Sequence, residues 1–171
     1  MLFRSWINNG RDKYTLFATG DTVDFQFSTD ANAKKKRRSA AIGDKRLLFA
    51  PWEGDVIAIL YDHRASKSEN PIEFTSPWRS EKVNDVRILE DLEPIVKLTR
   101  NGYELTVEIS LGLLGLKESS KISGDFGVTF GDSEGKETQL RSYWANSATM
   151  LVDDIPGEIM LHPNMWGTVK F

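Results

Sequence analysis

Short runs of alternating apolar and polar residues recur along the chain. The clearest is Tyr103–Ser110 (YELTVEIS), which has an apolar residue at every second position, the period of a half-buried strand. The Asn-Gly pair just before it, Asn101–Gly102, is typical of a tight hairpin turn and predicts a partner strand over 94–100. The run GDTVDFQFS from Gly20 alternates in the same way, so its apolar residues are expected to pack on a core and its polar residues to form the opposite face.

Other segments show different strand patterns. Asp55–Tyr61 (DVIAILY) is almost continuously apolar, which is typical of a central strand covered on both faces. Phe126–Phe130 and Thr138–Trp144 flank a Gly-Asp-Ser-Glu-Gly turn and predict a second hairpin. Shorter strands are predicted at 46–50, 72–75 and 86–89, with a tight turn at 51–54.

No long amphipathic helix is predicted anywhere in the chain. The run Leu111–Leu116, interrupted by two glycines, is interpreted as one helical turn or a compact connection. About nine or ten short strands separated by turn residues are typical of a sandwich. We therefore predict an all-β fold, an antiparallel β-sandwich, and leave jelly-roll and immunoglobulin-like Greek-key orders open. At 171 residues, the chain 1–171 fits a single domain with one core.

Composition and charge narrow the classes of partner. The net charge is −3 and the pI is about 5.5, so no overall positive field is available to hold a nucleic acid or an anionic membrane, and a neutral partner is expected. The basic run Lys34–Arg38 is interpreted as a solvated loop, because like charges repel and avoid burial.

The chain has no cysteine, which excludes disulfides, thiolate metal sites and a cysteine nucleophile. No apolar stretch approaches the ~20 residues of a membrane span, and no signal-peptide pattern is found.

Several motifs rich in glycine, aspartate and tryptophan follow one another along the chain. They are Gly20–Asp24, Gly43–Leu48, Ser76–Arg79, Gly102–Leu111, Leu114–Leu116, Gly124–Gly127, Gly131–Gly135, Arg141–Asn146 and Pro163–Gly167. In this order, and over most of the chain, they resemble the family 9 carbohydrate-binding modules and the broader DOMON-like family. The resemblance implies a β-sandwich from a secreted bacterial protein, extracellular or periplasmic. It also implies that a sugar end binds between aromatic side chains, as in some members, with structural calcium nearby.

Two features of the chain differ from the family pattern. In the family, strands usually precede a segment like Ser5–Gly20, so the chain is expected to lack its first strands and to be a fragment of a longer protein. The family also places a sandwiching tryptophan shortly before the final proline turn, whereas Ile155–His162 contains no aromatic residue. The second difference favours an alternative function: an interaction or scaffold β-sandwich that has lost sugar binding and docks on a neighbouring domain of its parent protein.

Two clusters combine an aromatic ring with the planar polar groups that match sugar hydroxyls. The predicted ligand-binding residues are Trp78, Arg79, Arg141, Trp144 and Asn146. Strand periodicity puts Arg141 and Tyr143 on one face of their strand and Trp144 on the other. Two alternatives remain open at this point. Trp144 could be a core residue, and Arg141 could be a structural cation paired with an acidic side chain of the hairpin over 125–134.

No cofactor is predicted, although a structural calcium ion is left open. The carboxylate pairs Asp21 with Asp24 and Asp153 with Asp154 offer oxygen ligands, but without the spacing of an EF-hand loop they are interpreted as turn residues. Haem-binding relatives use methionine and histidine ligands. The methionines near His162 are candidates for that role, but their spacing is not diagnostic.

Catalytic motifs are not found. The histidines lack an HExxH or comparable pattern, and no serine lies in a nucleophile elbow. A glycosidase carboxylate pair is recognised by the distance between its carboxyl groups, which a sequence does not provide. We therefore predict that the chain is not an enzyme. The function expected is a non-catalytic carbohydrate-binding module, with carbohydrate as its partner and neither nucleic acid nor membrane.

Overall fold

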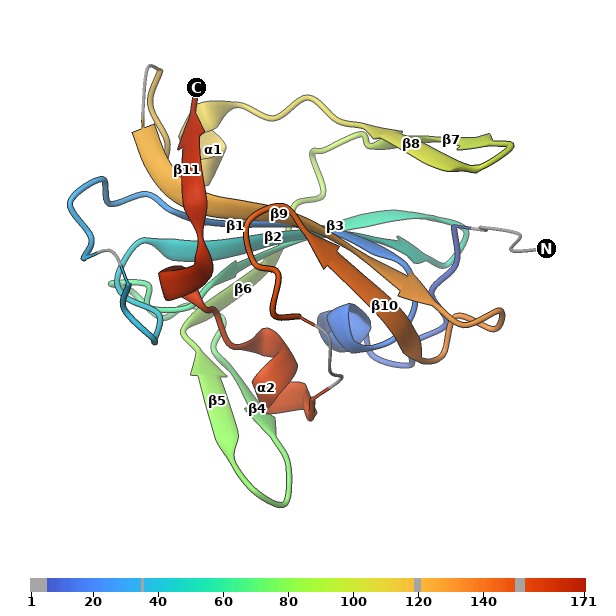
Figure 1. Ribbon diagram of the computed structural model, residues 1–171, viewed down its shortest axis with the longest axis horizontal. Helices are drawn as coiled ribbons and strands as arrows, with labels where there is room; N and C mark the ends of the chain where they lie inside the picture. The colour runs from blue at the N-terminus through green and yellow to red at the C-terminus, as the bar shows by residue number, and fades with distance from the viewer. Residues whose placement is uncertain (1–5, 35, 119–120, 150–152) are drawn as a thin grey trace.

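The structure, a computed structural model, describes residues 6–34, 36–118, 121–149 and 153–171 (Figure 1). Within these ranges, a seven-stranded antiparallel sheet has the order β10-β9-β1-β2-β3-β6, and β11 pairs with β9 beside β10. The strand bounds are β1 (Thr22–Ser28), β2 (Asp44–Trp52), β3 (Asp55–Asp62), β6 (Asp85–Ile88), β9 (Lys121–Gly131), β10 (Thr138–Tyr143) and β11 (Gly167–Lys170). The all-β prediction is confirmed.

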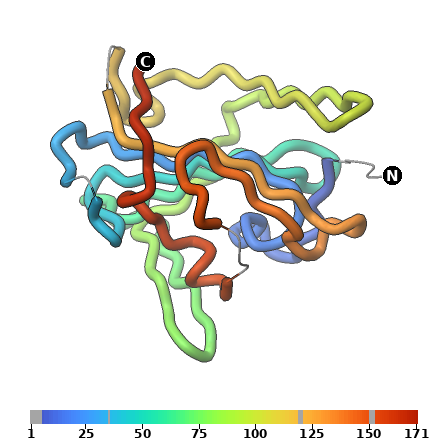
Figure 2. The backbone as a smooth tube through the Cα atoms, in the orientation of Figure 1, coloured from blue at the N-terminus to red at the C-terminus, as the bar shows by residue number. Residues whose placement is uncertain are grey.

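In the part of the chain that the structure describes, two further hairpins and four short helices surround this sheet. The hairpins are β4 (Ile72–Thr75) with β5 (Ser80–Val83), and β7 (Ile95–Thr99) with β8 (Gly102–Thr106). The helices are η1 (Lys13–Ala18), α1 (Leu111–Leu114), α2 (Ile155–Ile159) and η2 (Pro163–Met165). Figures 1 and 2 show that η1, α2 and the β4–β5 hairpin lie on one side of the sheet, and α1 and the β7–β8 hairpin on the other. We call these sides the α2 face and the α1 face.

Each face of the sheet carries its own apolar core, and a two-stranded sheet contributes to each core, so the sheets are layered as in a sandwich. On the α2 face, residues of β2 and β3 pack against η1 and α2; the buried members include Leu16, Phe17, Leu48, Ile59, Tyr61 and Ile159. On the α1 face, residues of β1 to β3 pack against α1 and the chain that follows it; the buried members include Phe25, Phe27, Leu47, Leu60, Leu114 and Leu116. Burying a side chain of this size stabilises the fold by roughly 1.5–3 kcal/mol. Among the described residues, no helix is long and apolar enough to cross a membrane.

The predicted hairpins are present, with small differences at their turns. In the β2–β3 turn, Glu53 and Gly54 both have positive φ (50° and 88°), as a two-residue turn of this hand requires. The Asn-Gly prediction was shifted by one residue, because Thr99 pairs with Gly102 and the turn therefore falls at 100–101. The strand predicted over 103–110 also ends early, at Thr106, although the residues beyond it still pack on the α1-face core.

The polar face of β1 is not at the surface. Thr22, Asp24 and Ser28 are completely buried, although the alternation in β1 predicts a half-buried strand. Figure 2 shows the reason: after β10, the chain returns along the α2 face through α2 and η2 before it adds β11, the last strand of the sheet. The even-numbered residues of β1 therefore form the floor of an interior polar region.

Candidate functional site

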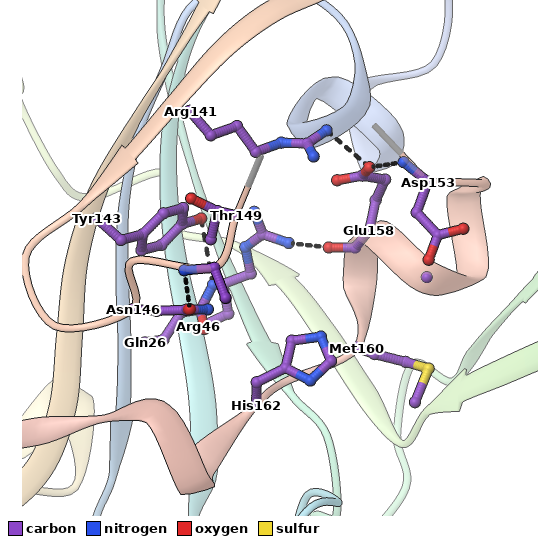
Figure 3. A pocket seen from close by; sticks show the side chains of 12 residues that line it. Gln26, Arg46, Arg141, Tyr143, Asn146, Thr149, Asp153, Glu158, Met160 and His162 are labelled. Carbon is purple, nitrogen blue, oxygen red and sulfur yellow. Dashed lines mark hydrogen bonds and ion pairs between the residues drawn. The ribbon is translucent and has the colours of Figure 1, made fainter. Parts of the chain in front are cut away.

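A pocket of about 670 Å³ opens on the α2 face, between the sheet and the returning C-terminal segment (Figure 3). Its floor consists of Gln26 from β1, Arg46 from β2, and Arg141 and Tyr143 from β10. Its walls include Asn146, Thr149, Asp153, Glu158 and His162. The pocket is therefore lined mainly by polar side chains that come from distant parts of the chain.

A buried ion pair lies in the floor. The guanidinium of Arg46 donates from Nε to Asp24 Oδ1 at 3.1 Å, and its Nη2 lies 2.8 Å from Asp24 Oδ2. This is a two-point contact between groups that are both buried. Burial alone would lower the pKa of Arg46, but the negative charge of Asp24 raises it above its ordinary value. The buried guanidinium therefore stays charged, and it needs the carboxylate of Asp24 as its partner.

Two more side chains donate to the same carboxylate. Gln26 Nε2 donates to Asp24 Oδ2 at 3.0 Å, and the hydroxyl of Tyr143 donates to the same oxygen. Burial raises the pKa of Tyr143, and the charge of Asp24 raises it further, so the phenol stays protonated. The floor is thus a connected network in which Asp24 accepts from three side chains.

A second ion pair joins the floor to the wall. Arg141 Nη2 lies 2.7 Å from Glu158 Oε1, which also accepts from the backbone N–H of Asp153 at 2.5 Å (Figure 3). Burial raises the pKa of Glu158, against the lowering effect of that backbone donor and of Arg141. Arg46 provides a further connection, because its Nη1 donates to the backbone oxygen of Glu158 at 2.8 Å.

The rim of the pocket is held by Arg79, which reaches from the β4–β5 turn. Its guanidinium lies 2.6 Å from Asp153 Oδ2 and 2.7 Å from Asp154 Oδ1. Asp154 also caps α2, because its side chain accepts from Gly157 N at 3.0 Å. The hydrogen bonds from Arg79 and Ser76 lower the pKa of Asp154 to about 2.

Two buried residues fix the backbone around the pocket. Asp125 accepts from the backbone N–H groups of Ala145 and Asn146, at 2.8 and 2.9 Å, where the chain leaves β10. His63 lies at the end of β3, completely buried, with Nε2 2.8 Å from the backbone oxygen of Ile159 in α2. The wall of the pocket is therefore anchored at both of its ends.

The absence of a side chain at Gly127 leaves room for the ring of Tyr143 in the floor of the pocket. A Cβ at Gly127 would lie 2.4 Å from carbons of that ring, well inside van der Waals contact. We expect Gly127→Ala to push the ring away from Asp24 and to lower the free energy of unfolding by about 1–3 kcal/mol. Gly112→Ala is the matched control, because nothing lies within 4 Å of its Cβ position and it should be neutral or slightly stabilising. Equal midpoints in urea for the two variants would contradict this role of Gly127.

The structure brings together some of the predicted ligand-binding residues and separates others. Arg141 and Asn146 line the pocket, and Arg79 holds its rim. Trp78 lies in the turn between β4 and β5, with its side chain 83% exposed. Trp144 is 61% exposed, so it is not a core residue, and it lies on the α1 face against Gly167. Neither tryptophan is among the lining residues of the pocket.

The sequence analysis gave the wrong partner for Arg141 and missed four residues of the pocket. The ion pair expected between Arg141 and a hairpin carboxylate is formed instead with Glu158. Gln26, Arg46, Tyr143 and Glu158 were not predicted as site residues. The alternation in β1 was the available signal for Gln26. Nothing in the sequence pattern indicated that α2 would lie over that face.

The carboxylates proposed as calcium ligands accept protein donors. Asp21 accepts from the backbone N–H groups of Ile7 and Gly131, at 3.0 and 2.8 Å. Asp24 is paired with Arg46, and Asp153 and Asp154 with Arg79. Among the residues that the structure describes, no group of three or more histidine, aspartate or glutamate side chains is placed to hold a metal ion.

Comparison with known proteins adds no family to this description. No protein-family model, no curated protein and no solved structure matches the chain. The function must therefore be argued from the chemistry of the pocket.

Proposed function

We propose that the protein is a non-catalytic carbohydrate-binding module whose polar pocket on the α2 face holds a neutral, hydroxyl-rich ligand. One observation carries the proposal. Every charged side chain among the described lining residues is already in an ion pair: Arg46 with Asp24, Arg141 with Glu158, and Asp153 with Arg79. Such a pocket offers many hydrogen-bonding groups but little net charge.

A sugar matches this combination of groups. A hydroxyl both donates and accepts a hydrogen bond, so it can meet amide, guanidinium and carboxylate groups without bringing a charge. Asn146, which follows β10, and Glu158 and His162, which lie in and just after α2, line the cavity (Figure 3). The volume of about 670 Å³ lies within the ordinary range of small-molecule sites. The motif resemblance to carbohydrate-binding modules supports the same class of ligand.

The ion pairs also favour binding over catalysis. A carboxylate that acts as a general acid or nucleophile must exchange protons with the substrate or attack it. Asp24 and Glu158 are each occupied by a guanidinium at hydrogen-bond distance. We therefore assign Asp24 and Glu158 to supporting the pocket and orienting the ligand, and not to catalysis.

Calorimetric titration with a panel of mono- and oligosaccharides tests the proposal. We expect measurable heat with at least one sugar, and about tenfold weaker affinity for Asn146→Ala and His162→Ala, since each change removes one polar contact of about 1.4 kcal/mol. Trp78→Ala is the control, because Trp78 does not line the pocket and its removal should leave the affinity unchanged. No heat with any sugar at millimolar concentration would refute the proposal.

The second candidate is an interaction domain that docks on a neighbouring domain of a parent protein. Trp78 favours it, because this large side chain is 83% exposed in the turn of a projecting hairpin. Exposed tryptophans are enriched among the residues that dominate protein interfaces. A silent sugar titration would make this candidate the preferred one.

A further inference from the structure

Three exposed aromatic side chains lie close to one another at one edge of the sheet. They are Phe126 in β9, Trp144 just after β10, and Phe171 just after β11, with exposed fractions of 44%, 61% and 40%. These three strands are neighbours in the sheet, since β10 and β11 both pair with β9 (Figure 1). We call the three residues the aromatic strip.

The strip lies on the α1 face, opposite the pocket. Phe126 pairs in register with Phe25, a member of the α1-face core. The ring of Trp144 lies against Gly167, which is two residues before Val169 of the same core layer. Side chains alternate along a strand, so Tyr143 faces the pocket while Trp144, the next residue, faces the strip.

The rings of the strip are supported from below. Phe126 stacks on Phe25 with centroids 4.3 Å apart and planes 5° apart, and Phe25 stacks in turn on Phe27 at 4.5 Å. Phe171 meets Phe25 edge-on at 6.4 Å.

Gly167 leaves no spare room beneath Trp144. A Cβ at this glycine would lie 2.5 Å from the indole ring. The exposed rings are therefore held in place by packing before any ligand arrives, which reduces the entropy lost on binding.

The surface around the strip carries no charge on these strands. Along β9, β10 and β11, the positions that share the strip's face are Ile122, Gly124, Val128, Phe130, Leu140, Ser142, Gly167 and Val169. An anionic membrane or a nucleic acid is held mainly by lysine and arginine, which these positions lack. Because these positions carry no charged side chain, the strip suits an uncharged partner.

The area of the strip argues against another protein surface as that partner. Aromatic side chains contribute about 150–250 Å² each, so the exposed parts of these three sum to roughly 300 Å². A stable protein interface, including one with a second copy of this chain, takes about 800 Å² from each partner. A few exposed aromatic rings suit the apolar C–H faces of sugar rings, which repeat along a polymer.

We propose that the aromatic strip is a second carbohydrate-binding surface, which holds the chain of an uncharged polysaccharide on the face of the sheet opposite the pocket. Binding comes from contact between the sugar C–H faces and the exposed rings of Phe126 and Trp144. The surface acts independently of the pocket, and this proposal stands even when the pocket takes no sugar.

Co-sedimentation with insoluble cellulose, chitin and xylan tests the proposal. We expect the wild type to sediment with at least one of them. Trp144→Leu keeps an apolar side chain but removes the ring, so its affinity should fall about tenfold, whereas Trp144→Phe should stay close to the wild type. Phe126→Leu should behave like Trp144→Leu. Circular dichroism of each variant checks that the fold is kept.

Two controls separate the strip from other sites. Trp78→Ala, outside both the pocket and the strip, should sediment as the wild type does, and so should Leu140→Ala, which removes an exposed aliphatic side chain from the same face. The proposal is overturned if the wild type sediments with none of the three polymers, or if Trp144→Leu and Trp144→Phe bind equally. It is also overturned if only Asn146→Ala, in the pocket, loses binding, because the polymer then lies at the pocket. A dimer that light scattering detects in the wild type and not in Trp144→Leu overturns it too, because the strip is then an interface between two copies of the chain.

Discussion

Asp24→Asn is expected to lower the free energy of unfolding by about 3–5 kcal/mol, because it leaves the charge of Arg46 buried without a partner. Arg46 is held by Asp24 through two contacts of 3.1 and 2.8 Å and is itself buried. The same substitution removes the charged acceptor of Gln26 and Tyr143, so the pocket floor should loosen together with the fold. Urea denaturation at pH 7 measures the change.

An exposed ion pair provides the control for this variant. Glu134 and Lys136 are 2.6 Å apart but well exposed, so Glu134→Gln should cost less than about 1 kcal/mol. The double variant Asp24→Leu with Arg46→Met removes both charges and should recover part of the stability that Asp24→Asn loses. A loss below about 1 kcal/mol for Asp24→Asn would show that the pair is not the central support of the floor.

The stability of the protein is also expected to fall by about 2 kcal/mol between pH 7 and pH 5 because of His63. Burial lowers the pKa of His63 from 6.5 to about 4, despite the hydrogen bond to Ile159, and the positive charges of Arg46 and Arg64 lower it too. Between these two values the unfolded chain binds a proton that the folded chain does not. Stability contributed by the neutral imidazole is therefore present above pH 6.5 and is lost as the pH falls towards 4.

Urea denaturation at several pH values tests this dependence. His63→Gln should flatten the slope between pH 7 and pH 5, because glutamine can still donate to Ile159 but does not titrate. His162→Gln is the matched control, because it replaces an exposed histidine in place of the buried one. Asp125 and Glu158 act in the opposite sense, since burial raises the pKa of each. Equal slopes between pH 7 and pH 5 for the wild type and His63→Gln would contradict the assignment to His63.

The sequence predicted the strands far better than it predicted their surroundings. Period-two alternation is a local property, so β1, β8 and the β9–β10 hairpin could be predicted from a few residues each. The same alternation correctly separated Arg141 and Tyr143 from Trp144. It could not tell whether the polar face of β1 meets water or protein, because that depends on α2, which lies more than a hundred residues later.

The site could be predicted only in part for the same reason. Arg141 and Asn146 were predicted because they lie near an aromatic residue in sequence, and both line the pocket. Arg46 and Glu158 are 112 residues apart in the sequence and are joined by a hydrogen bond. No local sequence pattern could have predicted that contact. The two predicted tryptophans were placed with the site because of their chemistry, but the structure puts them outside the pocket.

The hydrogen bonds of Asp125 to the backbone determine which residues of the pocket wall can be replaced. Asp125 fixes the chain where it leaves β10, and Asp154 fixes it again at the start of α2. Among the described residues between these two anchors, Asn146, Ala148 and Thr149 line the pocket and lie outside the strands. Their side chains can be changed while both anchors and the strands stay unchanged. Substituting Ala148 and Thr149 is thus a direct route to new ligand preferences on the same scaffold.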